Sequence, residues 1–93
     1  MDDRLEAHVI VSGLVQGVWY RASTQDAAAL HGVRGFVRNL PGGRVEAVLQ
    51  GDRRKVEAVI AFMRQGPPGA CVTDLAVTWR APSEPFDAFS IRR

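Results

Sequence analysis

Residues 34–50 read RGFVRNLPGGRVEAVLQ, in which two strand-forming runs flank a proline-glycine turn. Leu40-Pro41-Gly42-Gly43 has proline and glycine at the two central positions of a type II turn, where Gly42 supplies the required positive φ. The flanking runs, residues 34–39 and 45–50, are therefore expected to pair as a β-hairpin.

Upstream of this hairpin, the pattern predicts a strand and then a helix. Three consecutive β-branched residues within residues 7–12 indicate a well-buried strand. An alanine-rich stretch at about residues 22–30 indicates a helix, and Gly32 is placed to end it. A loop with two glycines, residues 13–20, connects the two.

Downstream of the hairpin, the pattern predicts a second helix and a further strand. Asp52 is a candidate N-cap, and Gly-Pro-Pro-Gly at residues 66–69 ends the helix. Apolar residues between them recur at i, i+3, i+4 and i+7, as on one face of a helix: Val56, Val59, Ile60 and Met63. Residues 72–79 alternate as a strand, with Leu75, Val77 and Trp79 on one side, and residues 86–91 are a candidate for a short fifth strand at an edge.

The predicted order is β-α-β-β-α-β, which indicates an α+β protein with a ferredoxin-like α/β sandwich. In this fold an antiparallel sheet, here of four to five strands, carries both helices on one face. A chain of 93 residues is too short for two independent cores, so residues 1–93 are expected to form a single domain.

Composition and charge narrow the classes of partner and compartment. A formal net charge of +2, from 12 Lys and Arg against 10 Asp and Glu, suits a small anion better than a long polyanion. Cys71 is the only cysteine, so no intrachain disulfide can form, which favours a reducing compartment. The charged N-terminus does not resemble a signal peptide, and no run approaches about 18 apolar residues. We expect a cytoplasmic protein without a membrane partner.

The loop between the first strand and the first helix has the features of an anion site. Glycines let successive backbone N–H groups turn toward one concavity, and a helix start leaves about four N–H groups without intrahelical partners. Arg21 adds a planar guanidinium that matches two phosphate oxygens. On spacing alone, a tight turn followed by a surface arginine explains the same residues equally well.

Asn39 is expected at the same edge of the sheet as this loop. In a right-handed β-α-β crossover the two strands run parallel, so both C-terminal ends lie at one edge. The Asn39 side chain offers an acceptor and a donor, with which it can orient a water molecule without being ionised. From the residues alone, a role as a turn residue that leads into the hairpin is equally possible.

Two segments resemble the signatures of a known enzyme family. Residues 11–21, VSGLVQGVWYR, resemble the first signature of the acylphosphatases, and residues 35–39, GFVRN, followed by Gly43, Val45 and Gly51, resemble the second. The resemblance implies an enzyme that hydrolyses the carboxyl–phosphate bond of small acyl phosphates, such as acetyl phosphate, carbamoyl phosphate or 1,3-bisphosphoglycerate. It also implies that the enzyme needs no metal or organic cofactor. The sequence does not determine the oligomeric state, and a monomer is the default expectation.

Residue by residue, the resemblance places the phosphate-binding arginine at Arg21 and the water-positioning asparagine at Asn39. It places the phosphate cradle on the backbone of five consecutive residues: Gln16, Gly17, Val18, Trp19 and Tyr20. Leu14 departs from the family pattern, in which a basic side chain is common, and this weakens long-range attraction of an anionic substrate.

Two other functions fit parts of the sequence. A non-enzymatic module that binds phosphate or a phosphoprotein would use the Arg21 loop and have no need of Asn39. RNA binding occurs on ferredoxin-like sheets, but it requires exposed aromatic residues on the central strands. Residues 7–12 and 45–50 contain none, so no nucleic-acid partner is expected.

Overall fold

The computed structural model describes residues 4–82 and 84–92, which form two helices and five strands. The elements in chain order are β1 (Arg4–Leu14), α1 (Tyr20–His31), β2 (Arg34–Asn39), β3 (Val45–Asp52), α2 (Arg53–Gln65), β4 (Cys71–Arg80) and β5 (Phe89–Arg92). Every predicted element is present, with ends that differ from the predicted ones by up to three residues. Neither helix in this described part combines the length and apolar character needed to cross a membrane.

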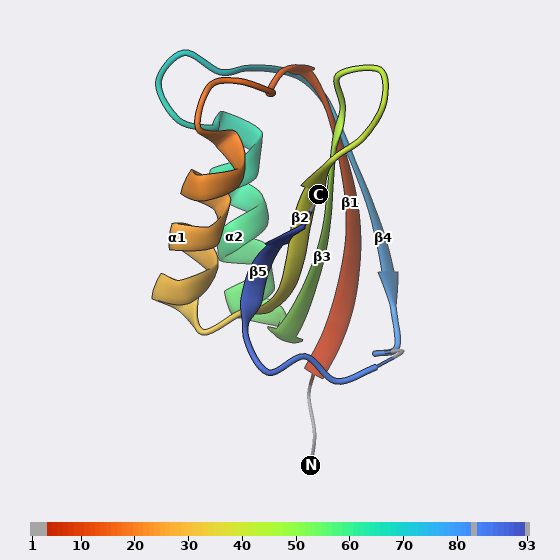
Figure 1. Cartoon of the computed structure of the whole chain (residues 1–93). Helices are drawn as coiled ribbons and strands as arrows, with labels where there is room; N and C mark the ends of the chain where they lie inside the picture. The colour runs from red at the N-terminus through yellow and green to blue at the C-terminus, as the bar shows by residue number, and fades with distance from the viewer. Residues whose placement is uncertain (1–3, 83, 93) are drawn as a thin grey trace.

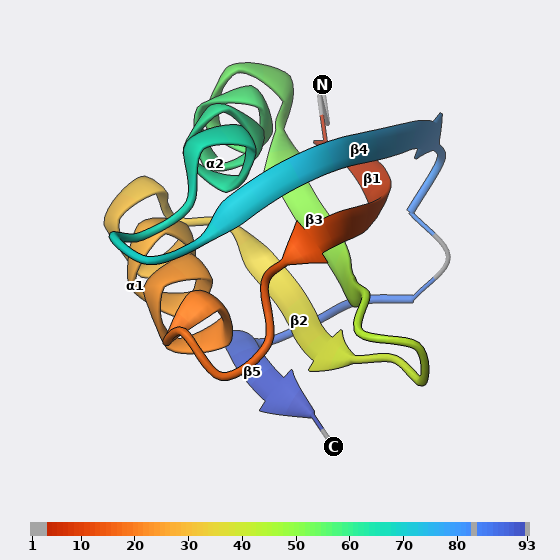
Figure 2. The same cartoon turned by 90° about the horizontal axis from the view of Figure 1, so that it is seen from above.

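The strands form one sheet in the order β4-β1-β3-β2-β5. β1 pairs antiparallel with β3 and β4, and β2 pairs antiparallel with β3. Both helices lie on one face of the sheet, as Figures 1 and 2 show from two directions. The predicted ferredoxin-like arrangement is confirmed.

The fifth strand joins the sheet in a direction that the sequence did not indicate. β5 pairs parallel with β2, in the register Val37 to Ile91, so the five-stranded sheet is mixed and only its first four strands are antiparallel throughout. After β4, the chain crosses to the opposite edge at one end of the sheet (Figure 1), and β5 starts from the end where β2 also starts. The two strands must therefore run in the same direction.

The core lies between the sheet and the helices. Alternate residues of β1 are fully buried. The four apolar residues predicted for α2 are buried as well: Val56, Val59, Ile60 and Met63. Leu75, Val77 and Trp79 of β4 pack against the edge of this core. Two local predictions are confirmed as well. Gly32 caps the end of α1 in the left-handed conformation, and Gly42 in the turn between β2 and β3 has a φ of 88°.

A β-bulge at the end of β1 directs the chain into the loop that precedes α1. The register between β1 and β4 shifts between Ser12 and Gly13. Gly13 has a φ of 124°, and a Cβ atom at this position would lie 2.1 Å from the carbonyl oxygen of Cys71. Only glycine fits so close to a neighbouring backbone, so Gly13 lets the strand bend where the loop begins.

Candidate active site

The loop between β1 and α1 carries backbone donors without partners. Gly17 and Trp19 have φ values of 75° and 64°, and Trp19 is the one non-glycine residue with a positive φ in the described ranges. The N–H groups of residues 15–19 donate no hydrogen bond to any residue that the structure describes. Consecutive free N–H groups in such a curled backbone are typical of anion-binding sites.

The start of α1 adds positive potential next to the unpaired N–H groups of the loop. Its N-cap is Trp19, which forms no side-chain capping bond, and the first turn contains no acidic residue. The aligned peptide dipoles place about half a positive charge at a helix N-terminus. Loop and helix together therefore present a positive potential that the described side chains do not neutralise.

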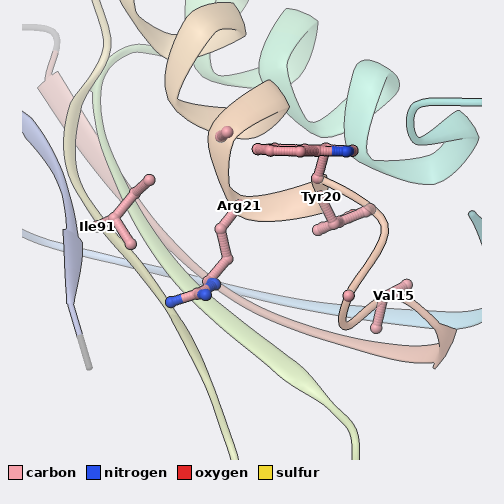
Figure 3. A pocket seen from close by; sticks show the side chains of 7 residues that line it. Val15, Tyr20, Arg21 and Ile91 are labelled. Atoms are coloured by element: carbon pink, nitrogen blue, oxygen red, sulfur yellow. The ribbon is translucent and has the colours of Figure 1, made fainter.

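Arg21 extends from the first turn of α1 into a pocket of about 440 Å³. Figure 3 shows its guanidinium between Val15 and Ile91. Arg21 is half-buried and forms no ion pair or side-chain hydrogen bond with any described residue. The pocket is lined by Val15, Gly17, Trp19, Tyr20, Arg21, Ala22 and Ile91.

Tyr20 anchors the end of the loop to the second helix. Its side chain is buried, and its hydroxyl donates a hydrogen bond of 2.7 Å to the carbonyl oxygen of Met63 in α2. Burial raises the pKa of the Tyr20 phenol above its usual value, so the group stays neutral and keeps its donor proton. This bond holds the residue next to Arg21 in place.

Asn39 ends β2 at the edge of the sheet where β1 gives way to the loop, as predicted. The loop and the β2–β3 hairpin lie at the same end of the molecule in Figure 1. Val37 is buried against the helices, and the two-residue period of a strand places Asn39 on that same face. The Asn39 Oδ1 atom is buried and has no hydrogen-bond partner, which leaves an acceptor available for a small ligand.

The Gln16 side chain joins the loop to the hairpin that follows Asn39. Its Nε2 atom donates hydrogen bonds to the carbonyl oxygens of Leu40, at 2.9 Å, and Arg44, at 2.8 Å. Leu40 is the next residue after Asn39, so this contact fixes the position of Asn39 relative to the loop. The sequence predicts a role only for the Gln16 backbone, because the partners of its side chain are carbonyls far along the chain.

An ion-pair cluster on the other face of the sheet holds the end of β2. Glu46 accepts a hydrogen bond of 2.5 Å from Arg38 and lies 2.7 Å from the Nε2 atom of His8. Burial of the Glu46 carboxyl favours a higher pKa, but the hydrogen bonds and charges of His8 and Arg38 outweigh it and lower the pKa. Glu46 is therefore ionised at neutral pH and ties three strands together beside Asn39.

The predicted site residues divide into two groups in the structure. Gly17, Trp19, Tyr20 and Arg21 line the pocket, whereas Gln16, Val18 and Asn39 are not among its lining residues. The sequence did not indicate Ile91 as a site residue, because only the parallel pairing of β5 with β2 brings it to this edge. Within residues 4–82 and 84–92, no three His, Cys, Asp or Glu side chains lie close enough together to hold a metal ion.

Comparison with known proteins identifies the family. The family model "Acylphosphatase" matches residues 7–91 of the chain. The chain belongs to the acylphosphatase family. An acylphosphatase of Haloquadratum walsbyi is 53% identical over 92 residues, which cover 99% of this chain and 98% of that one. An acylphosphatase of an Anaeromyxobacter species is 48% identical over 92 residues, which cover 99% of each chain.

A solved structure agrees with the family assignment. The crystal structure of acylphosphatase from Bacillus subtilis superposes with a TM-score of 0.93 at 34% identity, covering 96% of this chain and 99% of that one. The resemblance found in the two sequence signatures is thus confirmed over nearly the whole chain. As a member of the acylphosphatase family, the chain is an enzyme of the hydrolase class.

Proposed function

We propose that the chain hydrolyses the carboxyl–phosphate bond of small acyl phosphates to a carboxylate and inorganic phosphate. The observation that carries this proposal is a set of unpaired donors and an unpaired acceptor at the same end of the sheet. The loop N–H groups and Arg21 have no partners among the described residues, and the buried Oδ1 atom of Asn39 lies at the same end of the sheet without one. Relatives that share about half of the sequence are named for this activity.

In the proposed site, the phosphoryl group binds between the loop and Arg21. Its oxygens accept hydrogen bonds from the backbone of Gln16, Gly17, Val18, Trp19 and Tyr20. Each charge-assisted hydrogen bond contributes about 1.5–3 kcal/mol, so four or five of them offset the loss of ligand freedom. The same donors stabilise the charge that the phosphoryl oxygens carry in the transition state.

Asn39 then orients the attacking water. Its Oδ1 atom accepts a hydrogen bond from a water that stands in line with the bond to the acyl oxygen. The leaving group is a carboxylate, which is stable without protonation, so the reaction needs little acid catalysis. The proton of the water passes to the phosphate itself, and the mechanism uses no phosphoenzyme, metal or organic cofactor.

The two other functions account for fewer of these features. A module that only binds phosphate leaves the buried, unpaired Asn39 Oδ1 atom without a role. RNA binding on the open sheet face would rely on Phe36, but the guanidinium of Arg92 already lies 4.0 Å from the centre of that ring. Hydrolysis of acyl phosphates uses both the loop and Asn39.

We further propose that the enzyme works in the cytoplasm as a single-domain monomer with a small-molecule substrate. Cys71 is the only cysteine, so stability does not depend on an oxidising compartment. The apolar residues of the core are buried within one chain, without a contribution from a second copy.

Turnover of benzoyl phosphate, compared with that of a phosphate monoester and with that of the Asn39→Ala variant, tests the function. We expect the wild type to hydrolyse benzoyl phosphate far faster than the monoester. We expect Asn39→Ala to lose at least about 100-fold in kcat, or roughly 3 kcal/mol, while inorganic phosphate still inhibits residual turnover. A kcat near that of the wild type would remove Asn39 from the mechanism, and failure of the wild type to cleave benzoyl phosphate would refute the function.

A further inference from the structure

The pocket around Arg21 is larger and more apolar than a phosphate requires. Its volume is about 440 Å³, whereas a water molecule occupies about 30 Å³ of liquid and a phosphate has only five non-hydrogen atoms. Besides Arg21, its side-chain walls are hydrophobic or aromatic. A phosphoryl group bound at Arg21 therefore leaves most of the pocket to another part of the substrate.

The pocket is lined in part by exposed hydrophobic side chains. In the described part of the chain, four large hydrophobic residues are exposed: Leu14, Trp19, Leu30 and Ile91. Trp19, which is 82% exposed, and Ile91, which is 40% exposed, both line the pocket. Side chains this exposed contribute little to the core, so their apolar surface remains available to a ligand.

The fold places these side chains at different depths. Val15 is 1% exposed and forms the inner wall, whereas Trp19 and Ile91 stand at the mouth. Ile91 reaches the pocket because β5 runs parallel to β2 and ends at the same edge of the sheet. In Figure 3, Val15 and Ile91 lie on opposite sides of the Arg21 guanidinium, so apolar surface borders the phosphate position.

We propose that Val15, Trp19 and Ile91 hold the acyl group, which makes acyl phosphates with aromatic or branched apolar acyl groups the preferred substrate class. The inference rests on the proposed function and specifies its substrate. An acyl phosphate has one charged end and one organic end, and the pocket has a matching charged end and apolar wall. Contacts with the organic end position the reacting group, so they raise kcat/KM for substrates that make them.

The ratio of kcat/KM for benzoyl phosphate to that for acetyl phosphate tests this proposal. We expect a ratio well above one in the wild type. Ile91→Ala should lower this ratio by about tenfold, the lower end of what a lost apolar contact costs in a pocket, because Ile91 is partly exposed. Ile91→Leu, which keeps the volume, should restore most of it.

Two controls separate a substrate contact from a structural effect. Leu30→Ala removes a similarly exposed residue that does not line the pocket, and it should leave the ratio unchanged. Inhibition by inorganic phosphate, which has no acyl group, reports whether the cradle in each variant is intact.

Two results would overturn the inference while leaving the function standing. One is equal loss of benzoyl phosphate and acetyl phosphate turnover in Ile91→Ala. The other is a loss of phosphate inhibition that parallels the loss of benzoyl phosphate turnover. If the wild type cleaves neither acyl phosphate, the proposed function itself fails.

Discussion

The two helices begin in contrasting ways although each follows the first strand of a β-α-β unit. At the start of α2, the Asp52 carboxylate accepts a hydrogen bond of 2.9 Å from the backbone N–H of Arg54. The side chain of Arg53 pairs with Glu57 at 2.9 Å and lies 4.6 Å from the ring centre of Trp79. At this helix start, a backbone donor and the charge of Arg53 thus find partners within the protein.

The start of α1 has none of these internal partners. Trp19 lies in the left-handed region, so it does not have the extended backbone from which an N-cap side chain reaches the first turn. Arg21, the second residue of this helix, has no side-chain partner among the described residues. One helix start is thus capped within the protein, whereas the other leaves its donors without partners among the described residues, as the proposed phosphate site requires.

The largest effect is expected from the arginine of the open helix start. Arg21→Gln should reduce kcat/KM for benzoyl phosphate and the affinity for inorganic phosphate by at least about 100-fold each. Two charge-assisted hydrogen bonds are lost at about 1.5–3 kcal/mol each, and about 1.4 kcal/mol is tenfold. Steady-state kinetics with phosphate as inhibitor measures both quantities.

Arg54→Gln is the matched control, because it changes the second residue of α2, the helix that is capped by Asp52. It should leave turnover and phosphate inhibition as in the wild type. Normal phosphate affinity in Arg21→Gln would contradict the assignment of Arg21 to the phosphate.

A smaller effect is expected from Gln16→Ala, which removes the side-chain link between the loop and the β2–β3 hairpin. The two hydrogen bonds to Leu40 and Arg44 are lost, so Asn39 is no longer held at a set distance from the phosphate. Because small misplacements of a water-orienting group reduce catalysis strongly, we expect kcat to fall about tenfold, with a lesser change in phosphate inhibition. Stopped-flow or steady-state assays on benzoyl phosphate give kcat.

Gln25→Ala serves as the control for Gln16→Ala, since Gln25 also donates from its side chain to a backbone carbonyl, that of Phe89. It should leave kcat within about twofold. An equal fall of kcat in both variants would mean that the Gln16 contact acts through general stability rather than through the position of Asn39.

The smallest effect on activity is expected from the capped helix start. Asp52→Ala should lower the free energy of unfolding by about 1 kcal/mol, because it removes an N-cap hydrogen bond. In a domain of this size, that corresponds to about 4–8 °C in Tm. Urea titration measures the change, and kcat per folded molecule should stay unchanged; a lower kcat would show that both helix starts serve the site.

Short sequence patterns predicted much of the fold. Gly32 ends α1 and Asp52 caps α2 as predicted, because such caps depend on the conformation of one or two residues. The apolar face of α2 follows from a period of 3.6 residues and is buried as predicted. The two family signatures likewise lie in short continuous segments, so the chain itself identifies the family and the candidate residues Arg21 and Asn39.

Other features depended on contacts between distant segments. The direction of β5, and with it the place of Ile91 in the pocket, follows from the path of the chain around the end of the sheet. The Gln16 side chain meets carbonyls of the hairpin only after β1 and β2 have been brought to one edge. Periodicity and turn residues describe local conformation, whereas these contacts arise from packing and strand register, which only the tertiary structure contains.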